Sequence, residues 1–335
     1  MPPKRQHYVP RFYLDNFATP VEGRPPGFWV YDKEEDEPRW QPPVHTAVQE
    51  HFYTITREDG AKDYTVEKML GEVEHVAAPI IASWASGKVR PTKGEIAEMA
   101  SFVALLQTRG PRSIAAVREM TIAFAIEQMK ELVRQPETLK RYLAEIREED
   151  GSKLSEAEVI DSLTHLEERF RLSVDDRYAL AQSLQLTEAV SRQLEPMAWT
   201  LCVSDDPPFI TGDTPVCSFA LFKDGSAIFG AGFGQPQVEV TLPLSPSVCL
   251  LMTHRPSQQR IRVSEARVRE FNRRTAHIAE RFVISTLATK GMSKLVAKAR
   301  RTLDLPKIDR QEFGALVREG IRRFAPERSS GPGSA

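Results

Sequence analysis

Cysteine and long apolar runs are both scarce in this chain of 335 residues. Its three cysteines, Cys202, Cys217 and Cys249, are odd in number and widely separated, which argues against a disulfide framework or a zinc knuckle. No apolar run approaches the roughly 20 residues that span a bilayer. The first residues also lack the continuous apolar stretch of a secretory signal. We therefore expect reduced, buried thiols, no membrane helix and a cytoplasmic location.

Several familiar catalytic motifs are also missing from the sequence. The glycine-rich stretch at residues 230–234 is not followed by Lys-Ser or Lys-Thr, as a phosphate-binding loop would be, and it reads as a hairpin turn. There is no serine nucleophile elbow and no Cys-His signature. Any chemistry must therefore come from polar residues that are far apart in the sequence.

The formal net charge of −1 conceals an uneven distribution of charge. Residues 255–335 contain 19 Lys and Arg against 8 Asp and Glu, so the first 254 residues carry a net charge of −12. A basic segment of this kind favours an anionic partner, with nucleic acid as the first choice. The alternative is that it neutralises the acidic remainder of its own chain.

The middle of the sequence has helical periodicity. Apolar residues recur at three and four residues from Thr65, and Thr92 with Glu95 forms a capping-box pattern before a second helix. Further helices are predicted at residues 113–134, 155–170 and 175–194. We interpret residues 64–195 as a helical bundle.

A period of two follows over residues 196–263, which predicts an antiparallel sheet. A long helix is then expected at residues 264–289, with Arg267, Arg274 and Arg281 spaced by seven as a candidate substrate-binding face. The predicted fold is α+β: the helical bundle is inserted between a small N-terminal element and the antiparallel sheet, on which late helices pack. The expected domain organisation is one integrated unit, 1–327, followed by a disordered tail at 328–335. The parts of the unit are 1–60, 64–195, 196–263 and 264–327.

Two motifs stand out, and they carry a resemblance to a known family. They are Gln6-His7-Tyr8-Val9-Pro10-Arg11-Phe12-Tyr13-Leu14 and Phe209-Ile210-Thr211-Gly212-Asp213-Thr214-Pro215-Val216, supported by Pro243-Leu244-Ser245-Pro246. With these, residues 4–290 resemble the bacterial family known as domain of unknown function 4238. Members often have Ser and Asn where this chain has Gly212 and Thr214. The resemblance implies no activity, but it implies that the two ends of the chain meet in one fold.

The polar residues of these segments form one hypothesis about chemistry. His7, Arg109 and Asp213 are the candidate catalytic residues, and His7, Glu74 and Asp213 are the candidate ligands of a divalent cation, Mg²⁺ or Mn²⁺. Arg109 would hold a phosphate group in bidentate fashion, with Asn272 nearby. This constellation predicts a metal-dependent hydrolase or nuclease that acts in bacterial defence, including antiviral defence, or in toxicity.

Each of these residues also has an ordinary structural interpretation. His7 would then cap a helix, Glu74 would lie on a solvated helix face, and Arg109 would compensate the end of its own helix. Asp213 would cap its own turn. The alternative function is a non-catalytic sensor, or a protein that binds nucleic acid or another protein. Catalysis requires these groups around an open pocket, whereas the alternative allows them to be buried and satisfied.

Overall fold

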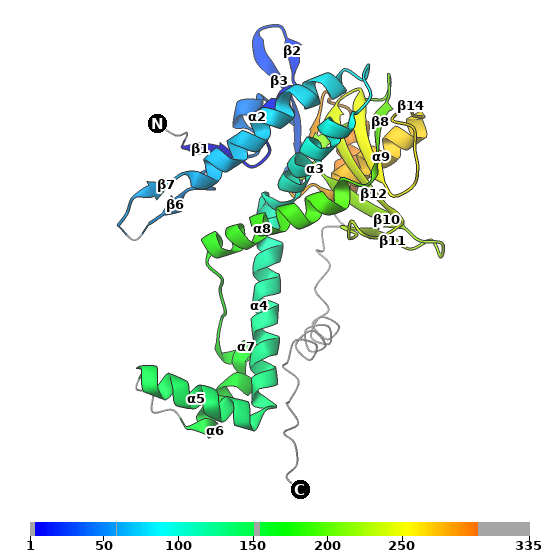
Figure 1. Cartoon of the computed structure of the whole chain (residues 1–335). Helices are drawn as coiled ribbons and strands as arrows, with labels where there is room; N and C mark the ends of the chain where they lie inside the picture. The colour runs from blue at the N-terminus through cyan, green and yellow to red at the C-terminus, as the bar shows by residue number, and fades with distance from the viewer. Residues whose placement is uncertain (1–3, 58, 151–154, 301–335) are drawn as a thin grey trace. The chain divides into compact units, whose positions relative to one another are not determined.

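The computed structural model describes residues 4–57, 59–150 and 155–300, which form two compact units (Figure 1). One unit comprises residues 4–114 and 180–300, and the other comprises residues 115–179. The expectation of a single integrated unit over residues 1–327 stays a prediction. The end of the predicted part 264–327, from residue 301, and the tail at 328–335 lie outside the described residues.

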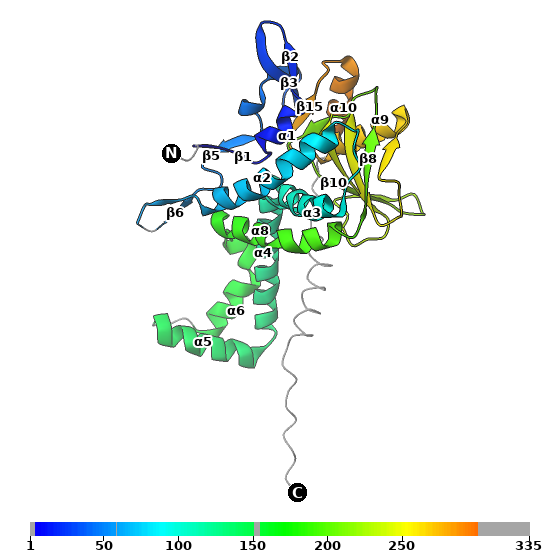
Figure 2. The same ribbon diagram turned by 45° about the horizontal axis from the view of Figure 1, so that its top comes forward.

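The mixed α+β class is confirmed. A series of helices occupies the middle of the chain: α2 (Thr65–Ala85), α3 (Lys93–Thr108), α4 (Pro111–Val133), α5 (Pro136–Asp150), α6 (Glu156–Thr164), α7 (Leu166–Arg169) and α8 (Asp176–Leu194). The predicted capping box at the start of α3 is present, with Thr92 accepting from the Glu95 N–H and Glu95 accepting from the Thr92 N–H. Helices α2 and α3 pack against each other (Figure 2). None of the described helices is long and apolar enough to cross a membrane.

The larger sheet has six strands, in the order β11 (Ala227–Phe229), β10 (Cys217–Leu221), β12 (Val238–Ser245), β13 (Val248–Thr253), β8 (Ala198–Val203) and β14 (Arg260–Arg262). The expected antiparallel pairing holds from β11 to β8. The edge strand β14 differs, because it runs parallel to β8.

A second sheet joins an early and a late segment of the described chain. Its strands are β2 (Thr19–Val21), β3 (Arg24–Asp32), β15 (Phe282–Ser285) and β9 (Thr211–Gly212), with β4 (Arg39–Gln41) also paired to β3. Strand β15 is antiparallel to both β3 and β9. The remaining described strands form two antiparallel pairs: β1 (Arg5–His7) with β5 (Val48–Glu50), which are distant in sequence, and β6 (Ile55–Thr56) with β7 (Lys62–Asp63), which are close in sequence. Three further helical elements are α1 (Arg11–Asp15), η1 (Pro43–His45) and α10 (Lys290–Arg300).

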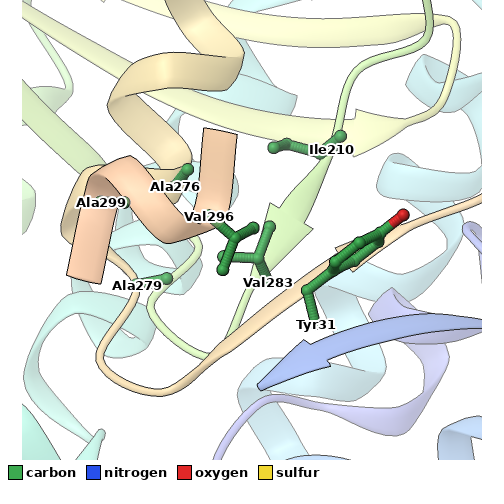
Figure 3. Close-up of a cluster of buried hydrophobic side chains, with 7 residues drawn as sticks. All are labelled: Tyr31, Ile210, Ala276, Ala279, Val283, Val296 and Ala299. Carbon is green, nitrogen blue, oxygen red and sulfur yellow. The ribbon is translucent and has the colours of Figure 1, made fainter. Parts of the chain in front are cut away.

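The predicted helix over residues 264–289 is wrong in its second half. Helix α9 (Glu265–Ile278) ends where Ala279 adopts an extended conformation, and the chain continues as strand β15. Val283 and Ile284 have no exposed surface, so this segment gains more by pairing between β3 and β9 than by continuing the helix. The apolar cluster beside it brings together α9, α10, β3 and β15 (Figure 3), through Tyr31, Ile210, Ala276, Ala279, Val283, Val296 and Ala299.

Candidate functional site

Asp213 binds the backbone that connects α9 to β15, residues 277–282, which we call the α9–β15 turn. Its carboxylate accepts the N–H groups of Glu280 at 2.8 Å, Arg281 at 2.7 Å and Phe282 at 2.8 Å. The side chain is buried, and burial raises the pKa of Asp213 while the three donors oppose that rise. Both carboxylate oxygens are therefore already used inside the fold.

The carbonyl groups of the same turn are bound by two cations. Lys33 donates from Nζ to the carbonyl of Ala279, and Arg112 donates to the carbonyl of Ile278 at 2.8 Å. Lys33 is only 6% exposed, and this burial lowers its pKa to about 8. Residues from three distant segments thus pair with carbonyl groups at the end of α9 and with the N–H groups of the residues that follow it.

Two further titratable groups border the α9–β15 turn. His277 stacks on Phe229 with 3.7 Å between ring centroids, and its pKa is lowered by burial and by the nearby charges of Lys33 and Arg112. Glu280 has a raised pKa, caused first by desolvation and then by Asp213. Perturbed acids and bases in one place are typical of functional sites, but also of structural ion networks.

Arg109 is at the centre of a separate cluster with His7 and Glu74. It is 2% exposed, and it donates to Glu74 Oε1 at 2.6 Å and to the His7 carbonyl at 2.6 Å. Its Nε donates to Tyr53 Oη at 3.3 Å, and that hydroxyl donates back to the Arg109 carbonyl at 3.2 Å. Each side-chain nitrogen of Arg109 therefore has a partner within the fold.

The imidazole of His7 is the least satisfied of the predicted site groups. Its Nε2 is buried without a hydrogen-bond partner. Burial lowers the pKa of His7, and a hydrogen bond with the Pro43 backbone opposes that shift. The ring is therefore held neutral near pH 7.

The structure distributes the predicted catalytic and metal residues over two places. His7, Glu74 and Arg109 come together, whereas Asp213 belongs to the α9–β15 turn. Burial and the charge of Asp213 both raise the pKa of the nearby Tyr8. Among residues 4–57, 59–150 and 155–300, no group of three or more His, Cys, Asp and Glu could hold a metal ion.

Some residues of these clusters were not anticipated. Tyr8 lies inside the opening motif, and Arg112 comes three residues after Arg109, at the start of α4, so both had a sequence signal. Lys33 and Tyr53 had no sequence signal, because the carbonyl groups to which their side chains donate are more than 50 residues away in the chain. Only the fold brings these side chains to the groups that they bind.

The predicted substrate-binding arginines are paired with carboxylates of their own unit. Arg267 donates to both Glu239 oxygens, at 2.9 and 2.8 Å, and Arg274 donates to Glu239 at 2.6 Å. Arg274 is buried, and its guanidinium lies 3.9 Å from the ring centroid of Phe219. Arg281 lies beyond the end of α9 and binds Asp32 at 3.0 Å. These pairs neutralise acidic residues of the same chain, the alternative that the charge distribution left open.

Asn272 fixes the segment Pro207–Ile210 that leads into β9. Its Oδ1 accepts the Ile210 N–H at 3.1 Å, and its Nδ2 donates to the Pro208 carbonyl at 2.9 Å. Beside this segment is a cavity of about 450 Å³. Its lining is mainly apolar and comes from Pro207, Pro208, Ile210, Arg269, Asn272, Ser285, Leu287, Thr289, Gly291, Met292 and Leu295.

The comparisons with known proteins agree with the family resemblance. A family model described as a protein of unknown function (DUF4238) matches residues 5–288. No curated protein and no solved structure matches the chain. The matched region contains both motifs, the α9–β15 turn and most of the cavity lining. The chain belongs to the DUF4238 family.

Proposed function

We propose that this chain is a non-catalytic sensor that binds a small, mainly apolar molecule in the cavity beside Pro207–Ile210. The observation that carries the proposal is this cavity of about 450 Å³, walled by the segment that precedes the Thr211-Gly212-Asp213 motif. Its volume is in the range of small-molecule sites, which are usually apolar with a few polar groups that orient the ligand. Arg269 is the charged group in the lining, and it suits a ligand with an anionic end.

The hydrogen-bond pairing of the buried polar residues supports a binding role over catalysis. Asp213 binds three backbone N–H groups, and Arg109 has a partner at every side-chain nitrogen. Buried polar groups that are fully paired stabilise a fold, and they must break those bonds before they can act on a substrate.

The cavity is also placed so that a ligand would affect the rest of its unit. Ile210 lines the cavity and belongs to the buried cluster with Ala276 and Ala279, next to the α9–β15 turn (Figure 3). A ligand that prefers one arrangement of this cluster would shift the population toward that arrangement. This coupling is what a sensor requires.

Dye binding tests the proposal. The probe is 1-anilinonaphthalene-8-sulfonate, an apolar dye with one anionic group, titrated against the folded protein. Leu295→Trp fills the cavity and should weaken binding by about tenfold or more, a loss of about 1.4 kcal/mol. Leu221→Trp, at a side chain 57% exposed on β10, is the matched control. Equal affinity in all three proteins, with unchanged melting temperatures, would refute the cavity as the binding site.

A metal-dependent hydrolase or nuclease with a role in bacterial defence is the second candidate. It is favoured by the raised pKa values of Asp213 and Glu280 next to Lys33, whose pKa is lowered to about 8. Its test is calorimetric titration of the wild type and of Asp213→Ala and Glu280→Gln with Mn²⁺ and Mg²⁺. Metal binding by the wild type that both folded variants lose supports it, and RNA and DNA cleavage assays then follow. If titration of the wild type with either metal gives no heat of binding, the metal-dependent candidate is refuted.

A further inference from the structure

The unit of residues 115–179 has an apolar groove. Side chains from three helices line it, including Ala125, Met129 and Leu132 of α4, Leu139 and Leu143 of α5, and Leu163 of α6. The groove encloses about 380 Å³. Tyr142, another lining residue, leaves half of its surface, 52%, in solvent. An open apolar surface of this kind marks an interaction site in soluble proteins.

The shape of this groove suits a helix. Its walls are helices, and an amphipathic helix that lays its apolar face between helices is a common mode of peptide recognition. The contacts would come from apolar residues spaced by three and four along the incoming helix. The occupant therefore needs an apolar stripe of about three turns.

The charge of the unit sets a second requirement. Residues 115–179 contain ten Lys and Arg against fifteen Asp and Glu, a net charge of −5. A partner with basic residues beside its apolar stripe would be attracted to this surface, and one with acidic residues there would be repelled.

One segment of this chain meets both requirements. The described residues end at Arg300, and the sequence continues for 35 residues with seven Lys and Arg against five Asp and Glu. Within it, residues 311–324 have apolar residues at helical spacing, namely Phe313, Leu316, Val317, Ile321 and Phe324. Arg318 and Arg323 flank this stripe on its two sides, and residues 311–324 contain three Arg against two Glu, a net charge of +1.

We propose that residues 311–324 bind in the apolar groove of α4, α5 and α6 within the same chain. The apolar stripe covers the exposed lining, and the arginines meet the acidic surroundings. A sensor could release this segment to a partner, but docking of the segment does not depend on the sensor role.

A pair of engineered cysteines in the full-length chain tests the proposal. Met129→Cys combined with Leu316→Cys should form an intrachain disulfide under mild oxidation, because bonded cysteines need Cα atoms within about 7 Å. Met129→Cys with Ala315→Cys is the matched control, since Ala315 lies off the stripe. The native cysteines are buried and do not compete. An intermolecular disulfide would identify a second copy as the occupant and overturn the proposal, as would equal cross-linking in both variants or none in either.

Hydrogen exchange provides a second test without new covalent bonds. In the full-length wild type, amides of residues 139–143 should be protected, and Leu316→Asp should speed their exchange by about tenfold or more. Ala315→Asp introduces the same charge one position away and should leave that exchange unchanged. If the two variants exchange alike at residues 139–143, the groove has another occupant or none.

Discussion

Asp213 and Lys33 bind opposite chemical groups of the same turn: Asp213 accepts the N–H groups of residues 280–282, and Lys33 donates to the carbonyl of Ala279. Asp213 directly follows β9, and Lys33 directly follows β3. Through this arrangement, an acidic and a basic side chain together satisfy the backbone where helix α9 changes into strand β15.

Asp213→Asn should lower the free energy of unfolding by about 2 kcal/mol, because the amide cannot accept all three N–H groups and turns a donor toward them. Chemical denaturation followed by circular dichroism measures this change. Asp36→Asn is the control, since the Asp36 side chain is 94% exposed and pairs only at the surface with Arg300. Comparable losses in the two variants would show that Asp213 does not hold the α9–β15 turn.

Arg109→Lys should destabilise the chain by about 3 kcal/mol, because one ammonium cannot reproduce the contacts of the guanidinium with Glu74, Tyr53 and the His7 carbonyl. Urea unfolding measures the effect. Arg192→Lys is the matched change at an exposed pair with Glu188, where less than about 1 kcal/mol is expected. A small effect at both positions would contradict the structural role of Arg109.

His7 should make stability depend on pH in the mildly acidic range. Its pKa in the folded chain is lowered from 6.5, so below that value the unfolded chain binds more protons and the folded chain loses stability as pH falls. Above pH 6.5 the contribution is complete. Unfolding at pH 7.5 and pH 5.5 should differ less in His7→Gln than in the wild type. His75→Gln, at an exposed position of α2, should retain the full wild-type dependence.

Much of the fold was predictable because its signals are local. Capping at Thr92 and the apolar period of α2 are properties of neighbouring residues, and both appear in the structure as predicted. The end of α9 was missed because its cause is distant: Asp213 and strands β3 and β9 capture residues that continue a helical pattern in the sequence. The predicted site is divided between two places for the same reason. The partners of Asp213 are mainly backbone groups, and no pattern of residues in the sequence predicts them.

Asn272→Ala should affect both stability and the proposed ligand cavity. The change leaves the Ile210 N–H and the Pro208 carbonyl without their partner, which should cost about 2 kcal/mol of unfolding free energy. Because Pro208 and Ile210 line the cavity, the anilinonaphthalene dye should also bind more weakly, by about fivefold, which corresponds to about 1 kcal/mol. Asn272→Asp retains an acceptor for Ile210 but not a donor for Pro208, and it should fall between Ala and the wild type in stability. If the Asn272→Ala protein is destabilised but folded and binds the dye with full affinity, the segment Pro207–Ile210 does not contribute to dye binding and the dye binds elsewhere.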